Sequence, residues 1–353
     1  MRKKILMVCT MPKDSYMGGV ATMVNDYVDH DVLFSEKGYD VSLFNFQTKS
    51  DNKITYYFKQ RKALRRYVAE NGVDVVHIHT SRNSVFFKDV LLAKFIKRKT
   101  RKKVVFTIHV GDISTVFEKI PSVLRKKALR ILNRFVDKIV FLSKKIQEQF
   151  VRQGYDKRKT IVLYNFHKNR SLTTDASDSK LSLLFVGMIN KDKGILELLS
   201  AIGSFSEENV HLDICGSITD NSIKDTFERA VADNGSKVAF HGYVSGEQKR
   251  RLFEKADVLV LPSYHEGMPL VILEALSYGC AVMATAVGAI PEILTDQNYY
   301  QVGIGSAEDL RVGIAHFLSD PADLVGMKKE NLELAKRFTI ENHIERLLSF
   351  ISE

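Results

Sequence analysis

Residues 257–293 read DVLVLPSYHEGMPLVILEALSYGCAVMATAVGAIPEI, and this stretch decides the fold. The apolar run at 258–261 leads into Pro262 and is typical of a buried strand. A polar loop follows, and then an apolar helical segment starts near Pro269, a residue suited to a helix's first turn. A second β-rich run occupies 281–287. Strand, helix and strand in this order predict two parallel strands joined by a crossover helix.

The same alternation of β-rich runs and helical segments extends over both halves of the chain, which predicts parallel sheets covered on both faces. Between the halves lies HKNRSLTTDASDSK, residues 167–180, whose near lack of apolar side chains indicates a linker. A chain of 353 residues also suits two cores better than one. We therefore predict an α/β protein with two Rossmann-like domains, 1–166 and 181–336, facing each other across a cleft, and a last helix in 337–353.

The charge is unevenly distributed. Residues 1–170 hold 36 Lys and Arg against 15 Asp and Glu, a balance of +21, whereas residues 171–353 hold 16 against 27, a balance of −11. Two basic runs, KRKTRKK at 97–103 and RKK at 125–127, lie on or beside amphipathic helical segments. Such runs form either a solvated face or a patch that attracts an anionic membrane surface. Nucleic acid is disfavoured as a partner because no reading module accompanies the charge.

The cysteines and the N-terminus bear on the cellular compartment. Cys9, Cys215 and Cys280 lie in or beside apolar runs without metal spacing, which predicts buried, inert thiols in a reducing compartment. The N-terminal run ILMVCTM is short and is followed by charged residues rather than a small-residue cleavage site, so it indicates a first strand. No apolar run approaches the roughly 20 residues that cross a bilayer. We expect a cytoplasmic protein, at the inner face of the cell membrane if the basic runs bind lipid.

Two carboxylates, Glu266 and Glu274, are the first candidates for a functional role. Glu266 lies in the loop and Glu274 eight residues later inside the helix, so the two do not share a helical face. They are either ordinary surface carboxylates or the two ends of a site for an extended ligand. The helix start between them offers free N–H groups and a positive dipole end, which suit a phosphate. Gly267 would let the backbone approach such a ligand closely.

In this context the stretch resembles the pattern of the retaining glycosyltransferases of the GT-B fold, in particular their large fourth family. That pattern is PS…EG…LEA…G followed by a GG/GA-x-PE element. The matching residues are Pro262, Ser263, Glu266, Gly267, Leu273, Glu274, Ala275, Gly279, Gly288, Pro291 and Glu292. Weaker agreement covers nearly the whole chain.

The resemblance implies a donor diphosphate site in LLFVGMINKDKGILELLSAI, residues 183–202, where Gly187, Lys193 and Gly194 match. Lys193 would neutralise phosphate charge as the leaving group develops. Met188 replaces an arginine that is common in the family, so stabilisation of the diphosphate is left to Lys193 and the helix start.

Histidines and a glycine pair carry the matches in the first half. Gly18 and Gly19 precede a helix and resemble a family element near the donor phosphate and the acceptor. His109 ends a strand at the place where the family's histidine contacts the transferred sugar. His77 and His79 alternate on one strand and share a face; we favour a structural or acceptor-side role over a metal site, because no third ligand is evident.

The remaining matches lie in turns. The Asn165 element has Phe166 in place of the family's glycine, and the turns at 215–217 and 241–244 resemble those that pack near the nucleotide base and ribose. The resemblance implies that Glu274 binds ribose hydroxyls and that Glu266, or the amides beside it, contacts the sugar and phosphate. The implied catalytic residues are Lys193, Glu266 and His109, and the implied substrate-binding residues are Gly18, Gly19, Gly187, Gly216, Val244, Gly267, Met268, Pro269, Leu270 and Glu274.

A retaining hexosyltransferase or N-acetylhexosaminyltransferase is thus implied. Its donor would be a nucleoside diphosphate sugar, a UDP-sugar in preference to GDP-mannose. Its acceptor would be a glycan or a polyprenyl-diphosphate-linked glycan of a bacterial capsule, exopolysaccharide or lipopolysaccharide. No obligatory cofactor or metal is implied, and the last helix would pack back on the first, acceptor-side domain.

Two other functions stay open. One is a non-catalytic subunit that binds a sugar nucleotide, which Met188 favours, and the other is a sugar-nucleotide epimerase. Hydride transfer and ATP chemistry are disfavoured, because neither G-x-G-x-x-G in its strand context nor G-x-x-x-x-G-K-[ST] is present.

Overall fold

A computed structural model describes residues 2–9, 19–46, 53–80, 84–110, 120–168 and 180–353. The chain folds into two compact units: unit 1 is Met1–Asn165 with Glu341–Glu353, and unit 2 is Phe166–Ile340. Each unit is built on a six-stranded sheet in which every pairing is parallel. The predicted α/β class with two Rossmann-like sheets is confirmed.

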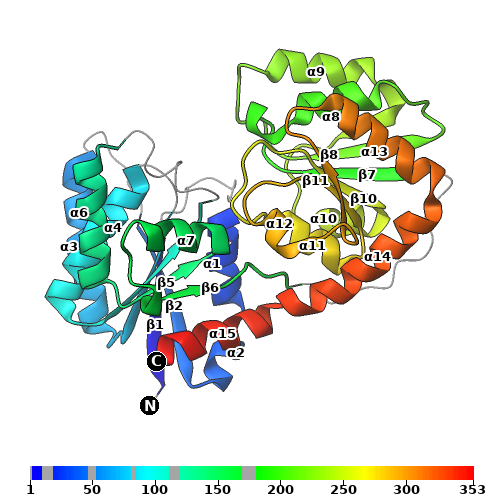
Figure 1. The fold of residues 1–353 in the computed structure, drawn as a ribbon. Helices are drawn as coiled ribbons and strands as arrows, with labels where there is room; N and C mark the ends of the chain where they lie inside the picture. Colours follow the sequence, from blue (N-terminus) through cyan, green and yellow to red (C-terminus); the bar gives the residue numbers. More distant parts are fainter. Residues whose placement is uncertain (1, 10–18, 47–52, 81–83, 111–119, 169–179) are drawn as a thin grey trace. The chain divides into compact units, whose positions relative to one another are not determined.

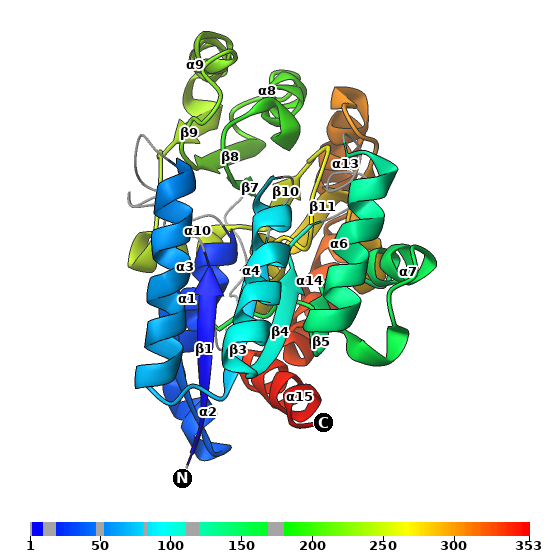
Figure 2. The ribbon, with the colours of Figure 1, turned by 90° about the vertical axis from the view of Figure 1, so that its left-hand side faces the viewer.

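Unit 1 has the strand order β2-β1-β3-β4-β5-β6. Its strands are β1 (Lys3–Cys9), β2 (Tyr39–Asn45), β3 (Val75–Thr80), β4 (Lys103–Ile108), β5 (Lys138–Phe141) and β6 (Thr160–Val162). Its helices are α1 (Gly19–Asp29), α2 (Asp31–Glu36), α3 (Lys53–Glu70), α4 (Ser84–Thr100), α6 (Ser122–Phe135), α7 (Lys144–Arg152) and α15 (Ile340–Ser352). Helices α3, α4 and α6 lie side by side on one face of this sheet (Figures 1 and 2).

Unit 2 has the order β12-β11-β10-β7-β8-β9. Its strands are β7 (Leu181–Val186), β8 (Val210–Cys215), β9 (Val238–Phe240), β10 (Val258–Leu261), β11 (Ala281–Thr285) and β12 (Tyr299–Val302). Its helices are α8 (Ile195–Ile202), α9 (Lys224–Asp233), α10 (Gly246–Lys255), α11 (Leu270–Ser277), α12 (Ile290–Ile293), α13 (Ala307–Ser319) and α14 (Pro321–Ala335). As the opening stretch of sequence predicts, β10 and β11 are parallel neighbours joined through α11.

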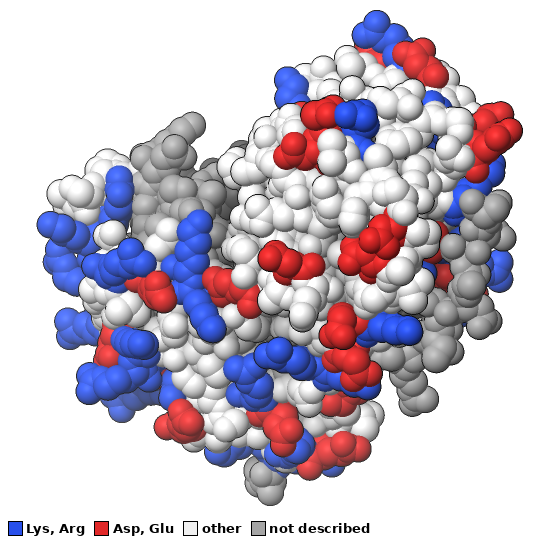
Figure 3. Space-filling view, turned by 45° about the vertical axis from the view of Figure 1, so that its right-hand side comes forward, with Lys and Arg blue, Asp and Glu red and all other residues white. Residues whose placement is uncertain are grey.

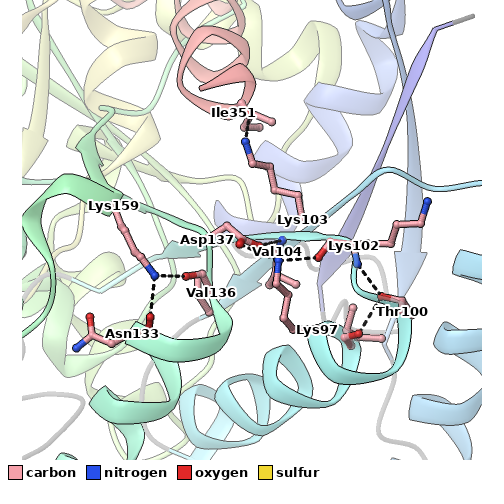
Figure 4. A network of polar contacts seen from close by, with 11 residues as sticks. Lys97, Thr100, Lys102, Lys103, Val104, Asn133, Val136, Asp137, Lys159 and Ile351 are labelled. Atoms are coloured by element: carbon pink, nitrogen blue, oxygen red, sulfur yellow. Dashed lines mark hydrogen bonds and ion pairs between the residues drawn. The ribbon is translucent and has the colours of Figure 1, made fainter.

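The end of the chain, Glu341–Glu353, belongs to unit 1. In α15, His343 Nε2 lies 2.6 Å from the hydroxyl of Tyr27, which is on α1. At the other end of the helix, Lys103 Nζ donates to the carbonyl of Ile351 at 2.5 Å (Figure 4). His167, the first residue of the predicted linker, instead pairs with the segment before α15, its amide donating to the Phe338 carbonyl. Residues 169–179 lie outside the described residues.

Two lysines of the first basic run, Lys97 and Lys103, bond to other residues of unit 1 and do not form part of a solvated surface patch. Lys97 Nζ lies 2.6 Å from Asp137 Oδ2 and also donates to the Lys102 carbonyl (Figure 4). Lys103 holds α15, as described above. On the face shown in Figure 3, Lys and Arg side chains are numerous over unit 1, in keeping with its sequence balance. Arg98 and Lys99 remain exposed at the end of α4.

All three cysteines are free and buried, as predicted. Burial raises the pKa of each thiol to about 12, which keeps the unreactive protonated form. Among the described helices, none combines the length and the apolar character needed to cross a bilayer.

Candidate active site

The strand order of unit 2 creates a topological switch point at the carboxyl edge of its sheet. Numbered by their order in this unit, the strands run 3-2-1-4-5-6, so the connections after β7 and β10 leave in opposite directions. Ligands of open parallel sheets bind at the carboxyl ends of strands at such a switch point. The loops at this point are 187–194 after β7 and 262–269 after β10.

Two glycines allow these loops to pack tightly. Gly194 has φ +65°, and a Cβ there would lie 2.2 Å from the Pro262 carbonyl oxygen. Gly288, at φ +59°, would place a Cβ 2.4 Å from the carbonyl oxygens of Glu266 and Gly267. A side chain at either position would displace the loop 262–269, which carries Glu266, because the clash is with the backbone of that loop and not with a side chain that could rotate away.

Lys193 and Glu266 meet at the switch point. Lys193 Nζ lies 2.5 Å from Glu266 Oε1, and Ser263 donates its hydroxyl to the same oxygen at 2.8 Å. The side chains of Lys193 and Glu266 are only 16% and 10% exposed. Because both side chains are largely buried, this charge-assisted hydrogen bond fixes their positions. An anion of higher charge, such as a diphosphate, would compete with Glu266 for the Lys193 ammonium.

Glu274 lies inside α11, as predicted, but it is not alone. Lys249 on α10 donates to Glu274 Oε1 at 2.8 Å and lies 2.6 Å from Oε2. The helix begins at Leu270 after Pro269, which contributes no side-chain cap. Two lysine–carboxylate pairs therefore flank the start of α11, where backbone N–H groups favour a phosphate.

The other residues implied for substrate binding in unit 2 occupy strand ends of the same sheet edge. Gly187 follows β7, and Gly216 follows β8, where its amide donates to the Gly242 carbonyl at 2.7 Å. Val244, after β9, is buried. Met188 is 46% exposed, so the residue that replaces the family's arginine presents a thioether to solvent.

The carboxyl edge of the sheet in unit 1 carries different residues from that of unit 2. Gly19 starts α1, and Gly18 lies outside the described residues. His109 follows β4, with its Nε2 3.1 Å from His79 Nδ1 on β3. The rings of His77 and His79 lie 4.2 Å apart, and His77 Nε2 lies 2.6 Å from the hydroxyl oxygen of Thr107. His77 and His79, predicted to share a face, are thus a buried pair whose rings are tilted by 33°.

Burial keeps these histidines uncharged. It lowers the pKa of His77 and His109 to about 3, with further lowering by neighbouring imidazoles, and it lowers that of His79 well below the usual value. Within the described ranges, no group of three or more His, Cys, Asp or Glu side chains is placed to hold a metal ion.

Sequence reasoning missed Lys249, although a signal was present. Lys249 precedes Phe253 by one helical turn, and Phe253 is fully buried, so the periodicity of α10 turns Lys249 toward the interior. Its neighbours Arg250 and Arg251 point outward and pair with Glu247. Because Lys249, Arg250 and Arg251 are consecutive basic residues, composition alone does not distinguish Lys249 from the other two.

The contact between Tyr27 and His343 could not be predicted, because no sequence pattern near either residue indicates it.

Comparison with known proteins assigns both units. Residues 173–337 match the family model described as glycosyl transferases group 1, and residues 20–167 match the model of glycosyltransferase family 4. The chain is 27% identical over 325 residues to an α-1,4-N-acetyl-D-galactosaminyltransferase of Campylobacter jejuni, covering 88% of this chain and 83% of the relative. It is 25% identical over 301 residues to an uncharacterised protein of the cps region of Klebsiella pneumoniae, covering 80% and 82%.

Solved structures show the same fold over the whole length. Sucrose-phosphate synthase from Thermosynechococcus elongatus aligns with TM-score 0.80 at 19% identity, covering 99% of this chain and 98% of that one. HepE from Anabaena, solved in complex with UDP, aligns with TM-score 0.75 at 17% identity, covering 99% of each chain. With both units matched by glycosyltransferase models and both sheets shared with GT-B structures, this chain belongs to the group 1, family 4 glycosyltransferases.

Proposed function

We propose that this glycosyltransferase moves a hexosyl or N-acetylhexosaminyl group from a nucleoside diphosphate sugar to a glycan or lipid-linked acceptor, with retention at the anomeric carbon. The observation that carries the proposal is the sheltered Lys193–Glu266 pair at the switch point of unit 2, beside the start of α11. A diphosphate is the anion best suited to an ammonium and a helix start presented together.

In the proposed reaction the acceptor hydroxyl oxygen bonds to the anomeric carbon while the bond from that carbon to the diphosphate oxygen breaks. The hydroxyl proton passes to the departing diphosphate, on the face it leaves, which accounts for retention without a protein nucleophile. Lys193 exchanges Glu266 for the diphosphate oxygens and stabilises their growing charge. Glu266 is then free to accept a hydrogen bond from a hydroxyl of the sugar, and Glu274 accepts hydrogen bonds from the ribose hydroxyls. The reaction needs no obligatory metal or cofactor.

The names of relatives support the substrate class. The Campylobacter jejuni relative is named for transfer of N-acetylgalactosamine to an undecaprenol diphosphate-linked glycan, and the Klebsiella pneumoniae relative for its place in the cps region. HepE was solved with UDP and with UDP-glucose. We therefore favour a UDP-sugar donor over GDP-mannose and a role in the synthesis of a bacterial surface polysaccharide.

The acceptor side of the proposal concerns the start of α6. Helix α6 ends two residues before β5, at the amino edge of the sheet, and its 14 residues span about 21 Å, so its first turn lies toward the carboxyl edge. Val123 and Leu124 in this turn are 69% and 47% exposed, and Lys126 and Lys127 beside them are also exposed. Exposed apolar side chains next to lysines suit contact with an anionic membrane surface, where the enzyme would bind a lipid-linked acceptor.

The deciding experiment is incubation of the protein with UDP- and GDP-sugars, followed by measurement of nucleotide release with and without a polyprenyl-diphosphate-linked acceptor. Turnover that disappears in Lys193→Ala and in Glu274→Ala supports the transferase. Nucleotide binding without turnover in the presence of acceptor contradicts it and favours the non-catalytic subunit that Met188 suggests. Interconversion of the donor sugar without transfer identifies an epimerase.

A further inference from the structure

Lys249 is the basic residue of α10 that faces the site. Arg250 and Arg251 form ion pairs with Glu247 at the helix surface. Lys249 instead reaches Glu274, and the two side chains are 27% and 20% exposed. A lysine that gives up hydration and side-chain freedom in this way has a fixed partner rather than a solvated one.

The surroundings of Lys249 hold its ammonium in place. Its Nζ lies 5.8 Å from the centre of the Phe253 ring, and that ring stacks on Tyr278 at 5.3 Å with an interplanar angle of 11°. Lys249 therefore contacts both the Phe253 ring and the Glu274 carboxylate.

The pair leaves Glu274 with capacity to accept hydrogen bonds. Lys249 Nζ lies 2.8 Å from Oε1, to which it donates, and 2.6 Å from Oε2, and no other side chain in the described part of the chain donates a hydrogen bond to this carboxylate. An ionised carboxylate has about four lone-pair positions. The Lys249 ammonium balances the charge of the Glu274 carboxylate and fixes its orientation, while lone pairs remain to accept hydrogen bonds from hydroxyl groups.

From this geometry we propose that Lys249 is a positioning residue for Glu274, holding the carboxylate in one orientation so that it accepts hydrogen bonds from the hydroxyls of a nucleotide's ribose. The inference rests on the proposed function, because it requires a nucleotide at the switch point of unit 2. Without Lys249 the Glu274 side chain gains rotamers and loses its counter-charge, so part of the binding free energy goes to ordering it again. Selectivity for ribose over 2′-deoxyribose should then fall.

The test is titration calorimetry of the full chain with UDP and 2′-deoxy-UDP, repeated with GDP and 2′-deoxy-GDP. The wild type should bind the ribonucleotide roughly tenfold or more tightly than its deoxy form, the value of a hydrogen bond to a charged acceptor. Lys249→Met should lose most of this ratio and weaken UDP binding roughly 3- to 10-fold. Lys249→Arg should retain most of the ratio.

Two further variants separate positioning from general damage. Lys255→Met alters an exposed lysine on the same helix and should leave both affinities unchanged. In the Glu274→Gln background, adding Lys249→Met should not lower the ratio further, because the two residues act through one contact. Thermal unfolding of each variant establishes that it is folded.

Each outcome bears on one claim or the other. An equal loss of affinity for UDP and 2′-deoxy-UDP in Lys249→Met, an unchanged ratio, or tighter UDP binding overturns the role of Lys249 and leaves the proposed function standing. Failure of the wild type to bind either ribonucleotide overturns the proposed function and the inference with it.

Discussion

The carboxyl edges of the two sheets differ in how they carry charge. In unit 2 the edge holds two lysine–carboxylate pairs, Lys193–Glu266 and Lys249–Glu274. In unit 1 the corresponding edge holds two imidazoles that burial keeps neutral: His79 near the end of β3 and His109 directly after β4, which are hydrogen-bonded to each other. One sheet architecture therefore supports two kinds of chemistry, and the side chains at the strand ends decide which.

The difference matches the two kinds of ligand in the proposed reaction. A diphosphate needs positive charge that can change partners, which an ion pair supplies. A neutral sugar hydroxyl needs hydrogen-bonding groups without net charge, and a neutral imidazole both donates and accepts. The following predictions break or sharpen this comparison, beginning with the largest effect.

The neutral histidines of unit 1 should make its stability depend on pH. Burial lowers the pKa of His77, His109 and His343 to about 3, whereas the unfolded chain keeps about 6.5. Below pH 6.5 these histidines bind more protons in the unfolded state, so their contribution to stability is complete above that pH. It falls by up to about 1.4 kcal/mol per pH unit for each histidine as the pH drops toward 3.

Hydrogen exchange at pH 7.5, 6 and 5, corrected for the intrinsic exchange rate, measures this effect. Protection in β3 and α15 should fall, while protection in β7 and β10 of unit 2 serves as the internal control. Equal loss in both units would contradict the assignment to these histidines.

Substitution of Lys193 tests the charged edge. Lys193→Ala should lower turnover by about 10²- to 10³-fold, because the departing diphosphate loses its cationic partner. Steady-state transfer with a saturating donor measures the loss. The matched control is Lys224→Ala, an exposed lysine on α9, which should keep full turnover. Full activity of Lys193→Ala would mean that the pair with Glu266 is structural only.

The contact of α15 with α1 tests how unit 1 is completed. His343 Nδ1 donates to the Tyr164 carbonyl at 2.8 Å, so Nε2 accepts from the Tyr27 hydroxyl. Tyr27→Phe removes this buried donor and should lower the free energy of unfolding by about 1–3 kcal/mol. Urea unfolding followed by circular dichroism measures it. Tyr39→Phe, a buried tyrosine of β2, is the control; an equal change in both variants would rule out a special role for the Tyr27 bond.

The smallest effect concerns lipid. Vesicles that contain anionic lipid should carry the protein in flotation, and neutral vesicles should not. Lys126→Ser with Lys127→Ser should weaken the association by roughly 5- to 30-fold, at about 1 kcal/mol per lysine. Arg98→Ser with Lys99→Ser, at the opposite end of unit 1, should have little effect. Equal, negligible binding to both kinds of vesicle would remove the membrane proposal.

Local patterns predicted most of the fold. Apolar strand runs and amphipathic helices gave both sheets, including β10, α11 and β11 in order, because a run of buried Val, Leu and Ile is specified by its own residues. The alternation does not by itself define the short elements α7, α12 and β12, and the segment 20–34, which has the periodicity of one helix, divides into α1 and α2 around His30. These elements are short, and tertiary packing decides short elements.

The sequence by itself determined the family and the identity of the candidate site residues of unit 2, since Gly187, Lys193, Glu266 and Glu274 lie within contiguous motifs. Only the tertiary structure decided their partners. The contacts Lys249–Glu274, His79–His109 and Tyr27–His343 join residues 25, 30 and 316 positions apart. Strand order and helix packing set such contacts, and neither follows from the periodicity of one segment, because that periodicity tells which face is buried and not what buries it.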